Sequence, residues 1–477
     1  MNPSYKLIIA GRERESGKRF TVLDKYTGET VAEVHAAERT HVDEAIAAAE
    51  KAKRIMADLP AHRRSTIIRA AARIIEKKKE ELTVAIAREA GKPYRYAKAE
   101  VERCVENLEY ISEEAKRIHG ETMPIDAGKS GEGRTGYYER HPIGIVAAIS
   151  PFNFPLNLAA HKLGPAVAAG CPVILKPASA TPISGIELVK AFVEAGVPDG
   201  GISVLPGSGS QVGDPLVSDG RISKISFTGS RAVGEEIVRK AGLKRVTLEL
   251  GSNSGVVIDR DAGDIDRIAK RCVLGAFYNQ GQVCISIQRI YVHQDRYEEF
   301  IRAFTAHAAA LKIGNPVDPG TEIGPMIAQS ELARVQSWVN EAIGQGAKLL
   351  FGNKCNGPVY FPTALTDIAP DMKVVKDEIF GPAAVVVKVD SFEQGVEQCD
   401  QSQYGLQAGV FTDSLNRALW AVKRLNVGGV MVNDFPSYRI DHMPYGGNKG
   451  SGLGREGAKF AIEEMTTLRM VIFNRAP

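Results

Sequence analysis

The chain has 477 residues, more than a single hydrophobic core organises, so two or three domains are expected. Hydrophobic residues make up 44% and charged residues 25%, which is typical of a soluble globular protein. The 60 basic and 57 acidic residues leave a net charge of +3, which argues against a protein that binds nucleic acid or an anionic membrane.

The N-terminal residues lack the charged-then-apolar layout of a secretory signal, and no apolar run of about 18 residues occurs. Neither export nor a membrane-spanning helix is therefore expected. The six cysteines are scattered without the spacing of a zinc site or a disulfide framework. We therefore expect a protein without a metal site that is located in the reducing cytoplasm, where a reactive thiol survives.

The first part of the chain is expected to combine short strands with long helices. Residues 5–35 have the pattern of strands and turns. Apolar residues then recur at helical spacing, which predicts helices over 42–56, 61–79, 80–90 and 97–118. Residues 134–141 have β-type composition without a long apolar run, and we expect them to form a strand that leaves the main body.

After Pro142 the pattern changes to short apolar strands that alternate with amphipathic helices. This alternation predicts parallel sheets with helices on both faces. The first such region has expected strands at 145–149, 173–175, 202–205, 224–227 and 245–250, with helices at 156–169 and 183–195. A second region covers about 256–431, with expected strands at 289–292, 383–389 and 408–412. The predicted fold class is α/β, with two doubly wound parallel-sheet domains and a small β element for oligomerisation.

Three strand ends carry polar or glycine-rich turns. Lys176 ends one strand, the run 207–213 follows another, and Phe227-Thr228-Gly229-Ser230 ends a third. Such turns line the crevice in which open α/β sheets bind ligands, and glycines there let backbone N–H groups approach a phosphate. The run 207–213 taken alone is weak evidence, because its GxGxxxG spacing is not the common dinucleotide pattern, and a plain turn is the better interpretation of it.

One cysteine, one carboxylate and one amide are candidates for chemistry. Cys284 follows a Gly-Gln step in a predicted turn that can present a thiol to a cleft, whereas the other cysteines are interpreted as inert core residues. Glu249 stands alone in an apolar strand, where a salt bridge with Lys244 or Arg245 is the alternative. Asn153 follows a strand between two aromatic residues, and its alternative is a turn former. A thiol that attacks and a carboxylate that later activates water suit a covalent thioester mechanism.

Several separated segments, spread over nearly the whole chain, resemble motifs of the aldehyde dehydrogenase superfamily. They are the hexapeptide 150–155, the Lys176 strand end, the turns 207–213 and 227–230, Leu248-Glu249-Leu250-Gly251, Gly281-Gln282-Val283-Cys284, Glu378-Ile379-Phe380-Gly381-Pro382 and Pro444-Tyr445-Gly446-Gly447. The resemblance implies an NAD(P)-dependent, non-acylating enzyme. It further implies that Cys284 is the nucleophile, that Glu249 is the base that activates water, and that Asn153 donates to the oxyanion. One departure is Ser252, which stands where most relatives have a second glycine after Gly251.

The same resemblance implies a cofactor site of eighteen residues. Lys176 would hold the adenosine ribose, Ser230 and the start of its helix would face the pyrophosphate, and Val233 would pack near the adenine. Glu378 would hold the nicotinamide ribose and Phe380 would pack against the nicotinamide ring. The full set is Ile149, Ser150, Pro151, Phe152, Lys176, Ala178, Ser179, Gly209, Gly213, Phe227, Thr228, Gly229, Ser230, Val233, Leu250, Gly251, Glu378 and Phe380.

Ser179 bears on the choice between NAD and NADP. It stands where strictly NAD-preferring relatives have glutamate, a residue that repels a 2′-phosphate by charge. Serine removes this repulsion, so we predict that NADP is accepted or preferred. An equally good interpretation is that Ser179 is a helix N-cap.

The substrate is expected to be a short aldehyde with a hydroxyl or anionic group. The segments around His161 and around Arg439 to His442 resemble the subgroup that acts on lactaldehyde. Relatives that handle glyceraldehyde 3-phosphate usually have arginine before the nucleophile, where this chain has Val283. A structural ion pair with Asp441 or another carboxylate is an equally good alternative role of Arg439. The candidate substrate residues are Phe154, Asn157, His161, Ile285, Arg439 and His442.

The resemblance also implies the domain plan. Residues 1–122 and 143–248 would bind NAD(P), residues 249–445 would form the catalytic domain, and residues 123–142 and 446–477 would bridge subunits of a homodimer or homotetramer. Two alternatives remain open at this point. One is an acylating, coenzyme A-dependent semialdehyde dehydrogenase, against which Glu249 counts, and the other is a catalytically silent structural member.

Overall fold

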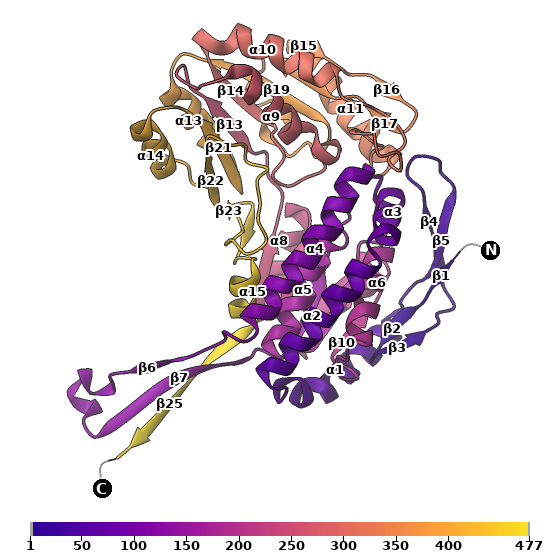
Figure 1. Cartoon of the computed structure of the whole chain (residues 1–477), viewed down its shortest axis with the longest axis vertical. Coiled ribbons are helices and arrows are strands. Elements are labelled where there is room, and N and C mark those ends of the chain that lie inside the picture. The colour runs from indigo at the N-terminus through magenta and orange to yellow at the C-terminus, as the bar shows by residue number, and fades with distance from the viewer. Residues whose placement is uncertain (1–2, 476–477) are drawn as a thin grey trace.

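The computed structural model of the protein describes residues 3–475. The alternation of strands and helices builds two α/β lobes, from which a narrow β arm extends (Figure 1). The first sheet has eight strands in the order β24-β12-β11-β8-β9-β10-β2-β3, with parallel strands in the middle and antiparallel strands at both edges. Their bounds are Gly452–Leu453 (β24), Arg245–Glu249 (β12), Ile222–Thr228 (β11), Ile145–Ile149 (β8), Val173–Lys176 (β9), Ile202–Val204 (β10), Leu7–Ile9 (β2) and Arg12–Arg14 (β3).

Helices cover both faces of this sheet because its strands are apolar on both sides. In β8, Val146 and Ala148 pack into one core while Ile145, Ala147 and Ile149 pack into another, as alternation along a strand requires. The first core is closed by α2 (Ala61–Lys77), α3 (Lys79–Ala90), α4 (Tyr94–Glu114), α5 (Asn157–Ala169), α6 (Ile183–Glu194) and α15 (Ala458–Glu464), and the second by α1 (Arg39–Ala57), α7 (Asp214–Ser218) and α8 (Arg231–Ala241).

The second sheet has seven strands in the order β15-β18-β19-β14-β13-β21-β22, all parallel except the edge strand β15. The strands are Lys348–Phe351 (β15), Thr363–Thr366 (β18), Ala383–Val389 (β19), Arg289–His293 (β14), Gly255–Ile258 (β13), Gln407–Phe411 (β21) and Gly429–Val432 (β22). Its helices are α9 (Ile265–Phe277), α10 (Gln294–Ala309), α11 (Gln329–Gly344), α12 (Lys373–Lys376), α13 (Phe392–Asp400) and α14 (Leu415–Arg424).

The arm is a three-stranded antiparallel sheet of β6 (Glu121–Met123), β7 (Arg134–Pro142) and β25 (Thr466–Asn474). Figure 1 shows it extending away from both lobes, with the end of β25 near its tip. Of the elements described within 446–475, β25 belongs to the arm, whereas β24 joins the first sheet and α15 packs on α5. Three small sheets complete the fold. The first contains Ser4–Tyr5 (β1), Arg19–Leu23 (β4) and Thr30–His35 (β5). The second pairs Cys355–Asn356 (β16) with Val359–Tyr360 (β17), and the third pairs Tyr404–Gly405 (β20) with Asn448–Lys449 (β23).

The expected helix over 97–118 is the largest boundary error. Helix α4 begins at Tyr94, directly after Pro93, and ends at Glu114. The chain must then enter the arm, where Gly120 comes so close to the carbonyl of Tyr138 that a side chain there would collide with it. Pairing with β7, which the local sequence does not reveal, therefore ends the helix early. Within residues 3–475, no helix is both long and apolar enough to cross a bilayer.

Candidate active site

The chain bends sharply just before Cys284. After α9, the residues Asn279, Gln280 and Gly281 adopt left-handed backbone angles, with φ of 49°, 55° and 65°. Such angles are rare for residues other than glycine and persist where the surroundings enforce them. The Gln280 side chain donates to two backbone carbonyls, and a side chain at position 281 would collide with the backbone of Gly381. These contacts fix the bend that presents Cys284.

Cys284 lies where two cavities meet. It lines both a pocket of about 240 Å³ and a cleft of about 430 Å³. Its sulfur is 3.0 Å from the hydroxyl oxygen of Tyr445. Burial raises the pKa of the Cys284 thiol to about 11, while the contact with Tyr445 and the charge of Arg439 oppose this rise. The resting thiol is therefore protonated at neutral pH, and its ionisation depends on its neighbours.

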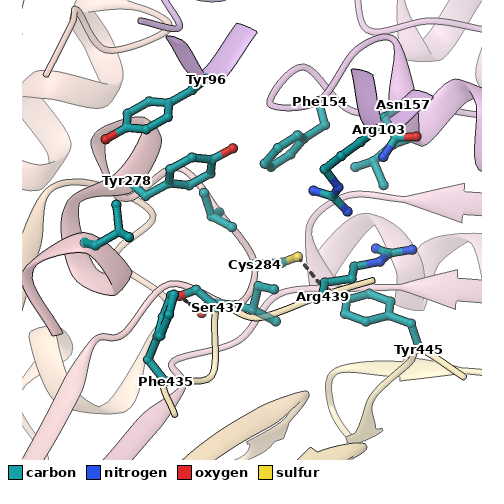
Figure 2. Close-up of a pocket in the computed structure, with 14 residues that line it drawn as sticks. Tyr96, Arg103, Phe154, Asn157, Tyr278, Cys284, Phe435, Ser437, Arg439 and Tyr445 are labelled. Carbon is teal, nitrogen blue, oxygen red and sulfur yellow. Dashed lines mark hydrogen bonds between the residues drawn. The ribbon is translucent and has the colours of Figure 1, made fainter. Parts of the chain in front are cut away.

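The smaller cavity, here called the substrate pocket, has an aromatic wall and a cationic side (Figure 2). Figure 2 shows Tyr96, Tyr278 and Phe154 on one side of the cavity, while the guanidinium of Arg103 reaches into it above Cys284. The remaining lining residues are Asn157, Leu158, Leu274, Val283, Ile285, Phe435, Ser437, Arg439 and Tyr445. The four predicted substrate residues Phe154, Asn157, Ile285 and Arg439 are thus brought together here.

Arg103 and Arg439 differ in how exposed their guanidinium groups are and in the partners that these groups contact. The Arg103 side chain is 30% exposed and donates two hydrogen bonds to Asp441, of 3.2 and 2.7 Å. The Arg439 side chain is 7% exposed, and its Nη2 donates to Glu456 at 3.2 Å. Its guanidinium also stacks 3.6 Å from the ring centroid of Tyr445. The ion-pair role considered for Arg439 is therefore present, and Arg103 is the more accessible cation.

The two predicted histidines do not line the substrate pocket. His161 is buried behind it, 2.9 Å from Asp441 and 3.2 Å from Arg439. His442 is exposed, and its ring packs against Tyr110 with centroids 4.8 Å apart. Because Asp441 turns inward to bind Arg103, the next residue faces outward. His442 is therefore outside the lining of the substrate pocket, and its contact with a substrate stays a prediction.

The larger cavity, here called the cofactor cleft, follows the carboxyl ends of the first sheet. The predicted cofactor residues that line it are Pro151, Phe152, Ala178, Thr228, Gly229, Ser230, Leu250, Gly251, Glu378 and Phe380, together with Asn153, Glu249 and Cys284. The predicted residues Ile149, Ser150, Lys176, Ser179, Gly209, Gly213, Phe227 and Val233 belong to the same strand ends and following turns but are outside its lining.

Several features of the cofactor cleft suit an anionic dinucleotide. Ser230 precedes α8 without a side-chain capping bond, which leaves helix N–H groups available to a phosphate. Lys176 is buried, and its ammonium donates a hydrogen bond to the backbone carbonyl of Pro177 at 3.2 Å. Burial lowers the pKa of Lys176 to about 8. An ammonium without a carboxylate among the described residues can serve a ribose or phosphate oxygen.

Ser252 and Ser179 each resolve an ambiguity of the sequence. The backbone N–H of Ser252 donates to Glu378 at 2.8 Å, so the missing second glycine leaves this loop able to hold the carboxylate. Burial raises the pKa of Glu378 to about 7. Ser179 donates to the carbonyl of Gly207 at 2.8 Å, and the following helix begins only at Ile183. Ser179 is therefore not a helix N-cap.

Glu249 ends β12 and is 4% exposed, and neither of its carboxylate oxygens has a hydrogen-bond partner among the described residues. The salt bridge considered for it is absent there, since Lys244 and Arg245 donate to backbone carbonyls instead. Burial, and then the charge of Glu456, raise the pKa of Glu249 well above its usual range. An unpaired buried carboxyl that lines the cofactor cleft is a strong candidate for a functional group.

Asn153 is tied to the loop that carries the cysteine. Its side-chain amide donates to the backbone carbonyl of Gln282 at 2.9 Å, across 129 positions of sequence. The side chain is buried and lines the cofactor cleft beside Cys284. The amide is therefore held near the sulfur by a contact that a turn-forming asparagine does not need.

The sequence motifs did not reveal every residue of the site. Tyr96 and Arg103 share a face of α4 because they are seven residues apart, and this spacing was the signal available for them. Glu331 and Arg334 of α11 line the cofactor cleft and are three residues apart. Phe435 and Ser437 come from a loop and Tyr278 from a short 3-10 helix, where no periodicity identifies them. Tyr445 belongs to the segment 444–447, but its contact with Cys284 does not follow from that motif.

The fold and these cavities place a cysteine between a cleft that suits a dinucleotide and an aromatic pocket. The sequence model of the aldehyde dehydrogenase family matches residues 12–471. The chain therefore belongs to the aldehyde dehydrogenase family, and it is an NAD(P)-dependent aldehyde dehydrogenase. The expected family, α/β fold class and NAD(P) cofactor are thereby confirmed.

Two relatives and one solved structure illustrate the similarity. The chain is 43% identical over 470 residues to 3-sulfolactaldehyde dehydrogenase of Priestia aryabhattai, covering 98% of each chain. It is 39% identical over 461 residues to lactaldehyde dehydrogenase of Methanococcus aeolicus, covering 96% of this chain and 97% of that one. The crystal structure of NADP-dependent glyceraldehyde-3-phosphate dehydrogenase from Bacillus halodurans C-125, complexed with NADP, is 36% identical with a TM-score of 0.96 and covers both chains completely.

Proposed function

We propose that this enzyme oxidises a three-carbon 2-hydroxyaldehyde that carries an anionic tail to its carboxylate. Cys284 would be the nucleophile, Asn153 the oxyanion donor and Glu249 the base. The observation that carries this proposal is the position of Cys284, which lines the substrate pocket and the cofactor cleft at once. An aldehyde carbon bound to this sulfur would lie between the two cavities.

The proposed chemistry begins at the sulfur. Cys284 first loses its thiol proton to solvent. As the resulting thiolate bonds to the aldehyde carbon, the carbonyl oxygen gains negative charge, and Asn153 would donate to it. Bound NAD(P)+ supplies the acceptor for the hydride that leaves the substrate carbon. The thioester on Cys284 is then hydrolysed by a water molecule that Glu249 deprotonates. The raised pKa of Glu249 makes it a stronger base than an exposed glutamate once it is ionised.

Residues at the ends of the strands and in the turns that follow them would hold the cofactor. Lys176 would meet the adenosine ribose, the start of α8 after Ser230 the pyrophosphate, and Val233 the adenine. Glu378 would hold the nicotinamide ribose and Phe380 would pack near the ring. Ser179 places no carboxylate near the ribose, which supports acceptance of NADP.

The substrate class is supported by the relatives and by the charge of the pocket. The names of the three proteins compared above refer to lactaldehyde, 3-sulfolactaldehyde and glyceraldehyde 3-phosphate, all of which are three-carbon 2-hydroxyaldehydes. Two of them carry an anionic group at the far carbon. Arg103 is a cation that can meet such a group, while the aromatic wall of the pocket limits its length.

We also propose that the arm binds a second copy of this chain, as part of a homodimer or homotetramer. Leu468, Met470, Ile472 and Phe473 of β25 are each between 40% and 59% exposed. A row of large apolar side chains on a projecting sheet suits burial against another subunit. The six cysteines are all free, which supports a cytoplasmic location for an enzyme that depends on a thiol.

The test is a set of initial rates with NAD and NADP on lactaldehyde, glycolaldehyde, succinate semialdehyde, glyceraldehyde 3-phosphate and 3-sulfolactaldehyde. We expect the highest kcat/KM for an anionic 2-hydroxyaldehyde, and a higher value for succinate semialdehyde would contradict this. The matched variant is Cys284→Ala, which should lose turnover while NADP still binds. Wild-type turnover in Cys284→Ala would refute the proposed nucleophile.

A further inference from the structure

Tyr445 lies in the segment Pro444-Tyr445-Gly446-Gly447, and the proposed function gives it no role. Its hydroxyl oxygen is 3.0 Å from the Cys284 sulfur, and Figure 2 shows this contact as a dashed line. Tyr445 is 2% exposed, so water does not compete freely for its hydroxyl group. Its backbone exchanges two hydrogen bonds with Glu456, of 3.0 and 2.7 Å, which fix the ring in place.

The direction of this hydrogen bond follows from the chemistry of the two groups. When both are protonated, either can be the donor. A thiol ordinarily ionises near pH 8.5 and a phenol near pH 10, so the sulfur loses its proton first. Burial raises the pKa of both groups, that of Cys284 to about 11 and that of Tyr445 well above its usual value. Once the thiolate forms, only the phenol carries a proton, and Tyr445 must be the donor.

We propose that Tyr445 donates a hydrogen bond to the thiolate of Cys284, which stabilises that thiolate and holds the sulfur at the junction of the two cavities. The proposal rests on the role of Cys284 given above and adds a residue to it. Arg439 supports the arrangement, because its guanidinium lies 3.6 Å from the centroid of the Tyr445 ring. A cation over the ring withdraws electron density from the phenol and so makes its hydroxyl a better donor.

Three other charged groups act on the Cys284 thiol. Arg439 favours its ionisation, whereas Glu378 and Glu249 oppose it. They come from three separate segments, namely the loop after β22, the loop before β19 and the end of β12. A change confined to the Tyr445 hydroxyl leaves all three in place, so its effect on the thiol can be measured separately.

The experiment measures the rate at which iodoacetamide alkylates Cys284 in the cofactor-free enzyme between pH 6 and 9, by mass spectrometry of the peptide that contains Cys284. Below the pKa of the thiol the alkylation rate is proportional to the fraction of thiolate, and we expect Tyr445→Phe to lower this fraction by about ten- to a hundredfold, the effect of one hydrogen bond to a charged group. A more basic thiolate is also more nucleophilic, so the alkylation rate should fall by about three- to tenfold. A rate equal to or above that of the wild type would overturn the proposal.

Two controls accompany this measurement. Cys355 is exposed, lies in β16 and lines neither cavity, so its alkylation in the same sample should not change. Tyr94→Phe removes a tyrosine hydroxyl that donates to Glu80 and lines neither cavity, and it should leave the Cys284 rate unchanged. Because alkylation requires no turnover, it tests Tyr445 even if Cys284→Ala shows that Cys284 is not the nucleophile.

A second variant covers the case in which Tyr445→Phe does not fold. Site-specific replacement of Tyr445 by 3-fluorotyrosine keeps the ring and the hydroxyl but makes the phenol more acidic, and therefore a stronger donor. We expect the alkylation rate of Cys284 at pH 7 to rise in this protein. An unchanged or lower alkylation rate would contradict the proposal. Because the ring is retained, a loss of packing would not explain that result.

Discussion

The side-chain amide of Asn153 donates to the backbone carbonyl of Gln282 at 2.9 Å. This single contact joins the end of a strand in the first lobe to the loop that carries the cysteine. An amide nitrogen has two N–H groups, so one can hold the loop while the other faces an oxygen that gains charge. Asn153 therefore has both a positioning and a donating function in the proposed site.

The variant Asn153→Ala should reduce kcat by about 10²–10³, the usual cost of removing one oxyanion donor. Binding of NADP, followed by fluorescence, should be nearly unchanged because other residues line the cofactor cleft. Steady-state kinetics on the preferred aldehyde provide the measurement. A kcat within threefold of the wild type would show that Asn153 only shapes the turn.

Replacement of Glu249 by glutamine should stop hydrolysis of the thioester more than its formation. We expect kcat to fall by about 10²–10⁴ while a burst of about one NADPH per active site remains. Rapid-mixing absorbance measurements distinguish the burst from the steady rate. Loss of the burst together with the steady rate would place Glu249 in an earlier step.

The same variant should change how stability depends on pH. The pKa of Glu249 in the folded state is raised above its unfolded value of about 4.3, so the folded protein keeps a proton that the unfolded chain releases. Stability attributable to this group is thus lost as pH rises above about 4.3, at a limiting slope of about 1.4 kcal/mol per pH unit. The glutamine in Glu249→Gln cannot ionise. The Tm of this variant minus the Tm of the wild type should therefore increase as the pH is raised from 5 to 8. The exposed Glu235, changed to glutamine, should show no such trend.

Arg103 should determine the preference for an anionic tail. Loss of a charge-assisted hydrogen bond of about 2 kcal/mol predicts that Arg103→Ala lowers kcat/KM for 3-sulfolactaldehyde by about thirtyfold. Lactaldehyde, which lacks the anionic group, should change much less. Arg95→Ala, an exposed arginine of the same helix paired with Glu322, is the matched control. Equal losses for both aldehydes would indicate a structural effect through Asp441 instead.

Ser179 should control the choice of cofactor. A carboxylate introduced by Ser179→Glu would repel a 2′-phosphate, and we expect the ratio of kcat/KM for NADP to that for NAD to fall at least about tenfold, or 1.4 kcal/mol. Ser179→Ala removes the bond to Gly207 without adding charge, so it should keep the preference of the wild type. An unchanged ratio in Ser179→Glu would mean that the 2′-phosphate lies elsewhere.

The local sequence determined much of the fold and the chemical groups of the site. Apolar strands such as 145–149 and 383–389 and the amphipathic helices between them follow from periodicity, because burial on one face or both leaves a repeating pattern. Motif resemblance identified Cys284, Glu249 and Asn153, and the structure brings all three to the cofactor cleft.

Only the tertiary structure decided what surrounds these groups. Arg103 lies in a helix far from Cys284 in sequence, and its reach into the substrate pocket depends on Asp441, which lies 338 positions away. The outward turn of His442, the early end of α4 and the contact of Tyr445 with Cys284 likewise depend on partners distant along the chain. Local sequence records which side chains can be buried or can react, whereas packing between distant segments fixes which of them meet and how far their pKa values shift.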